Sequence, residues 1–343
     1  MEINIKTDRT PDVKQNGASG EILMDVKHLR KWFPVAGSSR KEKKYVKAVE
    51  DLNLVIKKGE TLGIVGESGC GKSTFARLIL RLIEPTEGQV IFKGKDLTKL
   101  SDEEMRKTRR NMQMIFQDPY ASLNPRMRIG SILKEPYLIH GICSENEALK
   151  KAAGLLELVG LAGDSLKKYP HEFSGGQRQR ICIARALAVN PDLIVCDECV
   201  SALDVSIQAQ IINLLVKLQK ELGLTLVFIS HDLRIVQHIS TNVAVMYLGQ
   251  VVEMGPKAAL FGSPAHPYTK ALLSAVPLAD PGAEKNRIVL HGELPSPINR
   301  PSGCSFNTRC SLADESCRLN SPPVFLAGED HYCYCTKAGG EKR

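Results

Sequence analysis

The stretch that decides the fold is Gly66-Glu67-Ser68-Gly69-Cys70-Gly71-Lys72-Ser73-Thr74. An apolar run at 62–65 precedes it with the length of a strand, and an amphipathic run at 75–83 follows it at helical spacing. This context is typical of a phosphate-binding loop, because the glycines let backbone N–H groups turn inward and the helix N-terminus adds partial positive charge. We therefore expect Lys72 to reach the β- and γ-phosphates of a nucleotide and Ser73 to bind Mg²⁺. A glycine-rich turn that serves packing alone is the alternative.

Composition narrows the class of protein. The chain has 343 residues, of which 43% are apolar and 24% charged, as in ordinary globular proteins with more than one domain. No apolar run approaches the ~20 residues needed to cross a bilayer. Residues 1–20 are polar and lack the apolar core of a signal peptide. We therefore expect a cytosolic chain with a disordered N-terminal tail at 1–20.

The net charge of +8 raises the question of a nucleic-acid partner. Basic residues are scattered along the chain, with short runs at 40–44 and 106–110. No aromatic residues interleave with them as they do on surfaces that bind single strands. We therefore expect no nucleic acid and interpret the charge as a solvated basic face near lipid headgroups.

Downstream of the loop, strand and helix patterns alternate, which predicts a mostly parallel sheet covered by helices. Short apolar alternations at 21–54 predict further strands ahead of the loop. The other predicted strands are 89–94, 112–116, 193–196, 224–229 and 243–248. The predicted helical stretches are a helix opened by the capping box Ser101–Glu104, an insert at 129–169, and helices at 181–188 and 205–222.

Two acids stand at the end of the most apolar of these strands. Asp197 and Glu198 directly follow 193–196, and adjacent acids there are costly unless they face a cation or a reacting group. We expect Asp197 to hold Mg²⁺ through water and Glu198 to polarise an attacking water, whereas capping of the next helix is the alternative. His231 follows strand 224–229, so we expect it at the same crevice as the phosphate loop.

With Ser174-Gly175-Gly176-Gln177, these markers stand in the order found in the ABC ATPase family, which the chain resembles. The resemblance implies an α/β fold: a P-loop NTPase (RecA-like) core with a helical ABC subdomain at about 118–190, antiparallel β strands and a small cysteine-rich C-terminal extension. The nucleotide-binding domain would span 21–262 and the C-terminal domain 263–343.

The same resemblance implies roles for individual residues. Gln117 matches the glutamine that senses Mg²⁺ and water, and His231 the residue that contacts the γ-phosphate. Residues 174–177 match the signature motif, which covers ATP bound to a partner subunit, and Asp204 matches the aspartate of the loop after it. By its place ahead of the phosphate loop, Tyr45 is the candidate to stack on adenine, and a plain packing role is the alternative. The implied ATP site therefore contains Tyr45, the nine residues of the phosphate loop, Gln117, Asp197 and His231, with Ser73, Gln117 and Asp197 at Mg²⁺. The implied catalytic residues are Glu198, His231 and Gln117.

Four segments narrow the resemblance to the ATPases of oligopeptide and dipeptide importers, and within them to the oligopeptide "F" type. They are 115–127, 170–180, 201–208 and 266–270. The resemblance implies a subunit that hydrolyses ATP to drive peptide import, lying at the cytoplasmic face of the membrane. Its partners would be a sister ATPase, two permease subunits and, through them, an external peptide-binding protein. A soluble ABC ATPase outside transport is the alternative. Cys199 departs from the family, which usually has proline there.

Five of the ten cysteines crowd the last forty residues: Cys304, Cys310, Cys317, Cys333 and Cys335. A cytosolic chain argues against disulfides, and thiolates suit either a [4Fe–4S] cluster or a structural Zn²⁺. No Cys-x₂-Cys pair, which would favour zinc, occurs in this segment. The resemblance favours the cluster, with Cys304, Cys310, Cys317 and Cys333 as ligands and Cys335 as a spare. Zinc and unligated thiols remain the alternatives.

Overall fold

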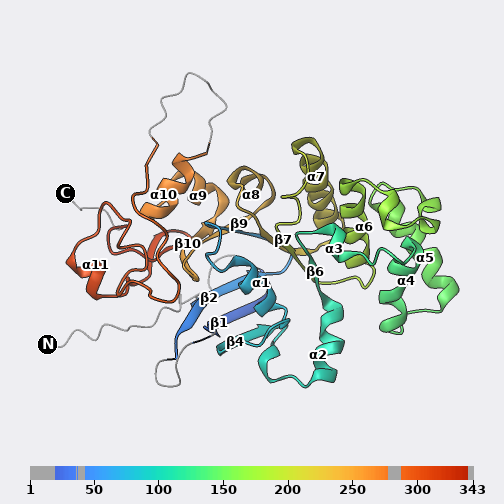
Figure 1. Cartoon of the computed structure of the whole chain (residues 1–343), viewed down its shortest axis with the longest axis horizontal. Helices are drawn as coiled ribbons and strands as arrows, with labels where there is room; N and C mark the ends of the chain where they lie inside the picture. Colours follow the sequence, from blue (N-terminus) through green and yellow to red (C-terminus); the bar gives the residue numbers. More distant parts are fainter. Residues whose placement is uncertain (1–19, 36, 38–42, 277–286, 339–343) are drawn as a thin grey trace. The chain divides into compact units, whose positions relative to one another are not determined.

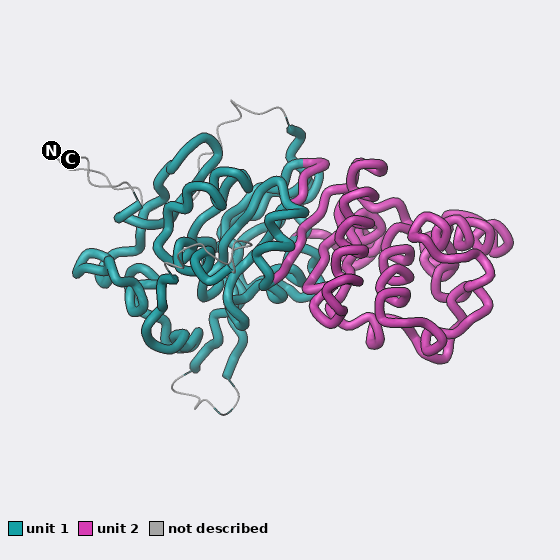
Figure 2. The backbone as a smooth tube through the Cα atoms, turned by 90° about the horizontal axis from the view of Figure 1, so that it is seen from above, with its two compact units in different colours: residues 1–57, 62–98, 231–343 teal, residues 58–61, 99–230 magenta. Residues whose placement is uncertain are grey.

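The structure is a computed structural model, drawn with its helices and strands labelled in Figure 1. It describes residues 20–35, 37, 43–276 and 287–338, so the predicted disordered tail lies outside the described residues except for Gly20. Two compact units divide the chain (Figure 2). Unit 1 comprises Met1–Lys57, Leu62–Thr98 and His231–Arg343, and unit 2 comprises Lys58–Thr61 and Lys99–Ser230.

An antiparallel sheet of unit 1 contains the predicted strands around the phosphate loop. Its order is β2-β1-β4-β5. The strands are β1 (Ile22–Pro34), β2 (Tyr45–Lys57), β4 (Glu87–Phe92) and β5 (Lys95–Asp96). The long β1–β2 pair carries several register shifts, which increase local twist. The strand predicted at 89–94 therefore exists, but it begins and ends two residues earlier.

A second set of strands in unit 1 carries the phosphate loop. β3 (Thr61–Val65) is parallel to β9 (Asn242–Tyr247), and β10 (Gln250–Pro256) is antiparallel to β9. The C-terminal strands β12 (His331–Cys333) and β11 (Phe325–Gly328) continue this sheet beyond β10. The expected small cysteine-rich C-terminal extension is therefore not supported, because β12 pairs with β10 and continues the sheet that contains β3 and β9. The helices are α1 (Lys72–Ile79), α8 (Leu233–Ile239), α9 (Lys257–Gly262), α10 (Pro267–Ser274) and α11 (Glu315–Leu319), with a 3₁₀ turn at Leu97–Lys99.

Unit 2 contains three parallel strands and the helical insert. β7 lies between β8 and β6, with bounds β6 (Met112–Ile115), β7 (Leu193–Asp197) and β8 (Thr225–Ile229). Every residue of β7 and β8 is buried, which explains their continuous apolar sequences. The helices are α2 (Asp102–Thr108), α3 (Pro119–Ser122), α4 (Ile129–Ile139), α5 (Glu145–Leu158), α6 (Gly175–Leu187) and α7 (Val205–Leu222), with 3₁₀ turns at Arg109–Asn111, Gly163–Lys167 and Pro170–Glu172.

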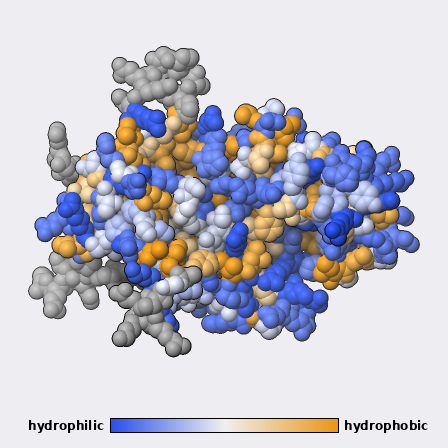
Figure 3. Space-filling model, in the orientation of Figure 1, coloured by the Kyte–Doolittle hydropathy of each residue, from blue (hydrophilic) through white to orange (hydrophobic). Residues whose placement is uncertain are grey.

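Local signals set several of these boundaries. The Ser101–Glu104 capping box opens α2 as predicted, and α7 has the predicted bounds. α6 begins at Gly175 rather than at 181, because Ser174 caps the helix ahead of its apolar stretch. No helix of the described residues is long and apolar enough to cross a membrane. The face drawn in Figure 3 is largely hydrophilic, with hydrophobic residues interspersed.

Candidate functional site

The phosphate loop of unit 1 joins β3 to α1 through a backbone that only glycine accommodates easily. Gly71 has φ +106°, and a Cβ there would lie 2.2 Å from the Ala48 carbonyl oxygen of β2. Lys72 is buried, and its Nζ donates hydrogen bonds to the carbonyl oxygens of Gly66 at 2.8 Å and Glu67 at 3.0 Å. The loop therefore wraps around its own lysine, as expected of a cradle that presents N–H groups and one ammonium to phosphate.

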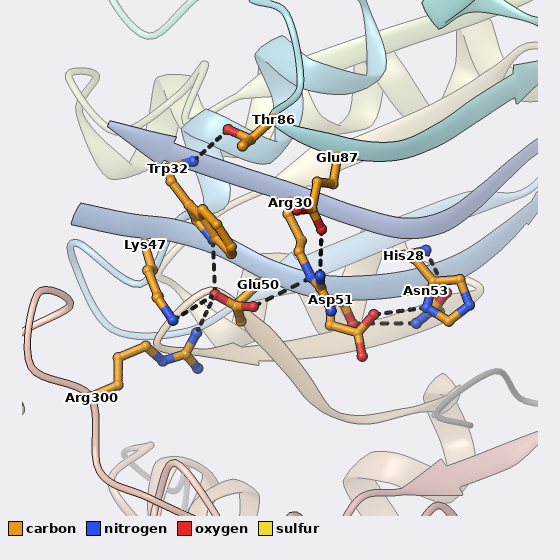
Figure 4. Close-up of polar contacts among 10 residues, drawn as sticks. All are labelled: His28, Arg30, Trp32, Lys47, Glu50, Asp51, Asn53, Thr86, Glu87 and Arg300. Atoms are coloured by element: carbon orange, nitrogen blue, oxygen red, sulfur yellow. Dashed lines mark hydrogen bonds and ion pairs between the residues drawn. The ribbon is translucent and has the colours of Figure 1, made fainter. Parts of the chain in front are cut away.

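Tyr45, the candidate for adenine stacking, begins β2 and is half-buried. Its ring centroid lies 6.4 Å from that of Trp32, the one tryptophan of the chain. Figure 4 shows Trp32 held by Glu50, whose Oε2 accepts a hydrogen bond from the indole Nε1 at 2.9 Å. Arg300 and Lys47 approach the same oxygen at 3.7 and 3.8 Å. The indole is thus fixed beside Tyr45, so that its fluorescence can report on events at this tyrosine.

In unit 2, the turn after β7 presents the two predicted acids. Asp197 ends the strand and is buried, whereas Glu198 is half-buried and adopts the left-handed backbone at φ +46°. Its conformation is held locally, because Ser201 Oγ donates to the Glu198 carbonyl oxygen at 2.9 Å. Gln117 Nε2 donates to Glu198 Oε2 at 3.0 Å. The structure therefore brings together two residues that the sequence pattern had assigned separately to the reaction.

The departure at Cys199 does not leave this turn loosely packed. Cys199 is buried at 1% exposure, and its side chain forms a hydrogen bond with that of Cys196, which is fully buried in β7. The hydrogen bond and burial raise the pKa of Cys196 well above its usual range, so the thiol stays neutral. Two small buried side chains therefore pack together next to Glu198 where the family usually has proline at 199. Neither this pairing nor the Ser201 contact could be predicted from the sequence pattern.

The signature motif lies at the N-terminus of α6. Ser174 Oγ accepts from the Gln177 backbone N–H at 3.3 Å, and the Gln177 Oε1 accepts from the Ser174 N–H at 3.0 Å. This capping box fixes the start of the helix. A Cβ on Gly176 would lie 2.4 Å from Ile207 Cγ2, so this glycine also lets α6 approach α7 closely. The motif thus serves packing within unit 2 as well as presenting a helix N-terminus.

Two further predicted residues stand at helix starts. Asp204 is the N-cap residue of α7, but its carboxylate does not cap the helix. His231 is exposed and lies between β8 and Asp232, whose side chain caps α8 by accepting from the Arg234 N–H at 2.9 Å. The predicted nucleotide residues divide between the units. Unit 1 holds Tyr45, 66–74 and His231, and unit 2 holds Gln117, 174–177, Asp197, Glu198 and Asp204.

Four C-terminal thiols line one small cavity in unit 1, with room of about 10 Å³. The four are Cys304, Cys310, Cys317 and Cys335, and His266 lines the same cavity. Cys333, a predicted ligand, lies buried in β12 and does not line it. Burial raises the pKa of Cys304 to about 11, and the neighbouring thiols add to the shift. Among the described residues, no group of three or more His, Cys, Asp or Glu side chains is arranged to hold a metal ion, so the predicted cluster has no support from the geometry.

Two known protein families match the chain, one over the region of the phosphate loop and one over the C-terminal region. The ABC transporter family matches residues 49–201, and the oligopeptide/dipeptide transporter C-terminal region matches 252–317. The oligopeptide transport ATP-binding protein AppF of Bacillus subtilis (strain 168) is 52% identical over 322 residues, which cover 93% of this chain and 98% of AppF. The oligopeptide transport ATP-binding protein OppF of Escherichia coli (strain K12) is 50% identical over 323 residues, covering 92% of this chain and 96% of OppF.

Solved structures agree with the fold. The dimeric structure of MJ0796, a bacterial ABC transporter cassette, has a TM-score of 0.61 and 32% identity, covering 68% of this chain and 99% of that one. A dimeric post-hydrolysis state of the same cassette, bound to ADP and Pi, gives the same values.

Proposed function

The chain belongs to the family of oligopeptide and dipeptide ABC transporter ATP-binding proteins, and on this premise we propose how its residues bind and hydrolyse ATP. It has the ABC ATPase P-loop fold and is the ATP-binding, ATP-hydrolysing subunit of a peptide importer, where it works with membrane permease subunits. A soluble ABC ATPase outside transport is therefore set aside. The roles of individual residues, the second ATPase and the C-terminal thiols are proposals.

We assign nucleotide binding to the phosphate loop and chemistry to the turn after β7. The ammonium of Lys72 and the loop N–H groups hold the β- and γ-phosphates, with Tyr45 against adenine. Ser73 and Asp197 would hold Mg²⁺, which would supply positive charge beside the γ-phosphate. His231 contacts the γ-phosphate.

The observation that carries the chemical part is the hydrogen bond from Gln117 to Glu198. A carboxylate that polarises water must be aimed, and the Gln117 amide together with the Ser201 hydroxyl fixes both ends of this residue. Glu198 accepts a proton from the attacking water. The water oxygen bonds to the γ-phosphorus as the bond from that phosphorus to ADP breaks, and ADP leaves. Gln117 would also contact Mg²⁺ and the attacking water, the role that the family resemblance implies for it.

The test is Glu198→Gln, which keeps the shape and removes the charge. We expect ATP hydrolysis by the assembled transporter to fall about 10²- to 10³-fold, because only the group that activates water is lost. Glu157→Gln, an exposed change on α5, is the matched control and should leave the rate unchanged. Hydrolysis by Glu198→Gln near the unchanged rate would refute the assignment.

We further propose that the chain pairs with a sister ATPase, so that its signature motif covers ATP held by the partner. The capped N-terminus of α6 offers an anion site, and the similar cassette MJ0796 was solved as a dimer. Ser174→Arg should abolish hydrolysis in the assembled transporter while this chain still binds ATP at Lys72. Loss of that binding in the variant would contradict an arrangement in trans. Two permeases, reached through the loop that follows Gln117, and an external peptide-binding protein complete the proposed importer at the cytoplasmic face of the membrane.

For the C-terminal thiols we propose a metal centre whose ligands are Cys304, Cys310, Cys317 and Cys335. What supports it is that these four thiols line one cavity; Cys335 replaces Cys333 in the predicted set. A [4Fe–4S] cluster, which the resemblance implies, would require the thiols to move apart, because about 10 Å³ is room for one water at most. A single Zn²⁺, the alternative, suits four thiolate donors, but these side chains are not arranged to hold a metal ion and would have to reorient around it. Iron, sulfide and zinc analysis of an anaerobic preparation decides between them, and a folded C-terminal region with none of the three refutes the proposal.

A further inference from the structure

One residue of the phosphate loop, Glu67, is held by two residues from the C-terminal region of the chain. Arg309 Nη1 lies 2.8 Å from Glu67 Oε2 and 3.1 Å from Oε1, so one nitrogen contacts both carboxylate oxygens. The hydroxyl of Tyr268, in α10, accepts a hydrogen bond from the Glu67 backbone N–H at 3.0 Å. All three residues belong to unit 1. The contacts span 201 and 242 positions of sequence, so they exist only because the C-terminal region folds over the loop.

These contacts are largely shielded from water on the side of the C-terminal region. The Arg309 side chain is 10% exposed and lies over the Tyr247 ring, 6.0 Å from its centroid. Tyr268 is fully buried, and Phe306 packs against it at a centroid distance of 5.3 Å. The Arg309 N–H donates to the Phe306 carbonyl oxygen at 3.1 Å, which anchors the turn that carries the arginine. An ion pair in such surroundings is screened less than a surface pair and fixes the geometry of both groups.

The negative charge of Glu67 explains why its contact with Arg309 would matter for binding ATP. A carboxylate within a phosphate-binding loop repels the triphosphate that the loop must hold. Arg309 neutralises that charge and holds the carboxylate on the side of the C-terminal region. Tyr268 fixes the backbone of the same residue, whose carbonyl oxygen also accepts from Lys72 at 3.0 Å.

We infer that Arg309 is a positioning residue for ATP binding, acting through Glu67, and that Tyr268 supports the same loop residue. The C-terminal region is thus part of the nucleotide-binding machinery of this chain. The inference rests on the proposed role of the phosphate loop.

The test measures the dissociation constant for MgATP on the full chain, with radiolabelled ATP and Mg²⁺ at equilibrium. Arg309→Met leaves the Glu67 charge uncompensated, so we expect about 10-fold weaker binding. This is the effect usually seen when a hydrogen bond to a charged group is lost. In the assembled transporter, KM should rise by the same factor while kcat changes less than about twofold. Arg318→Met, an exposed change in the same region, is the matched control and should change nothing. Arg309→Lys should restore most of the affinity, because a single nitrogen makes both contacts.

A second variant separates this role from a merely structural one. Glu67→Gln removes the repulsive charge, so it should bind MgATP at least as tightly as the unchanged chain. Arg309→Met combined with Glu67→Gln should bind far more tightly than Arg309→Met alone. If the pair were only a structural tie, both single variants would weaken binding and the double variant would not recover. That outcome, or unchanged affinity in Arg309→Met, overturns the inference.

Two controls make each outcome decisive. Lys72→Ala must lose MgATP binding; if it does not, it is the proposed role of the loop that fails, and not the role of Arg309. If Arg309→Met does not fold, as judged by thermal unfolding, then Arg309→Lys and Glu67→Gln carry the test with the same predicted order of affinities.

Discussion

The phosphate loop, to which we assign nucleotide binding, and the turn at Glu198, to which we assign the activation of water, are held in different ways. Each follows a strand whose residues are all buried, β3 and β7. The loop depends on contacts with distant parts of unit 1, namely Ala48 beneath Gly71 and Arg309 beside Glu67. The turn combines near and distant contacts: the Ser201 hydroxyl and the thiol of Cys199 lie within three residues of Glu198, whereas Gln117 and the Ile229 carbonyl oxygen contact Glu198 from other strands and loops of unit 2.

This difference indicates how binding and hydrolysis can be separated. Changes around the loop should act on ATP affinity, because the groups there hold phosphate before and after the bond breaks. Changes around the turn should act on turnover, because Glu198 is needed only as water attacks. The predictions below test whether the two regions are separable in this way.

The largest effect is expected for Lys72→Ala. The lysine supplies the one buried ammonium of the described loop, and its removal leaves the phosphates without their main counter-charge. MgATP binding to the purified chain should fall by about 10²-fold or more. Isothermal titration measures it. Lys93→Ala, an exposed lysine of the same unit, serves as the control, and unweakened binding by Lys72→Ala would contradict the role of the loop.

A smaller loss of affinity, with a loss of stability, is expected for Gly71→Ala. The added Cβ would meet the Ala48 carbonyl oxygen at 2.2 Å in a left-handed backbone, so the loop must shift away from β2. We expect the free energy of unfolding to fall by about 1–3 kcal/mol and ATP affinity to fall with it. Gly94→Ala is matched for backbone, with φ +77° and open space around its Cβ position. Equal effects of the two changes would show that contact with β2 is unimportant.

At the turn, Ser201→Ala should slow hydrolysis without weakening binding. The change removes the hydroxyl that donates to the Glu198 carbonyl oxygen and so loosens the residue at φ +46°. Loss of one such hydrogen bond, worth about 1 kcal/mol, corresponds to a rate about five- to tenfold lower. Ser144→Ala, at a helix start where the hydroxyl makes no capping hydrogen bond, is the control. A weaker ATP affinity in Ser201→Ala would contradict the claim that the turn acts on hydrolysis and not on binding.

The smallest effect concerns the thiols behind Glu198. Because the pKa of Cys196 is raised by its hydrogen bond to Cys199 and by burial, the thiolate is scarce at neutral pH and becomes available only as pH rises toward that pKa. Iodoacetamide at pH 8 should therefore modify the half-buried Cys143 well before Cys196. Mass spectrometry of the peptides measures both. Equal rates for the two cysteines would show that the packing behind Glu198 is open.

Local patterns predicted much of this fold. The phosphate loop, the capping box of α2 and the bounds of α7 follow from residues adjacent in sequence, where the physical signal is complete. Strand β10 was missed, although it pairs with both β9 and β12. The partners of Glu67 could not be predicted, since contacts between residues more than 200 positions apart leave no periodicity to detect. Cys333 was predicted as a ligand, but Cys335 lines the cavity in its place. Cysteine spacing alone does not reveal which thiols face a cavity.

The separation of binding from chemistry is tested most directly by titrating MgATP into Glu198→Gln and Lys72→Ala and following the fluorescence of Trp32. This single tryptophan lies 6.4 Å from Tyr45, ring centre to ring centre, so it should respond when adenine binds. We predict that Glu198→Gln saturates with the affinity of the unchanged chain despite its lost turnover, whereas Lys72→Ala gives no saturable change. Loss of saturable binding in Glu198→Gln would contradict the claim that the loop binds ATP and the turn acts only in hydrolysis.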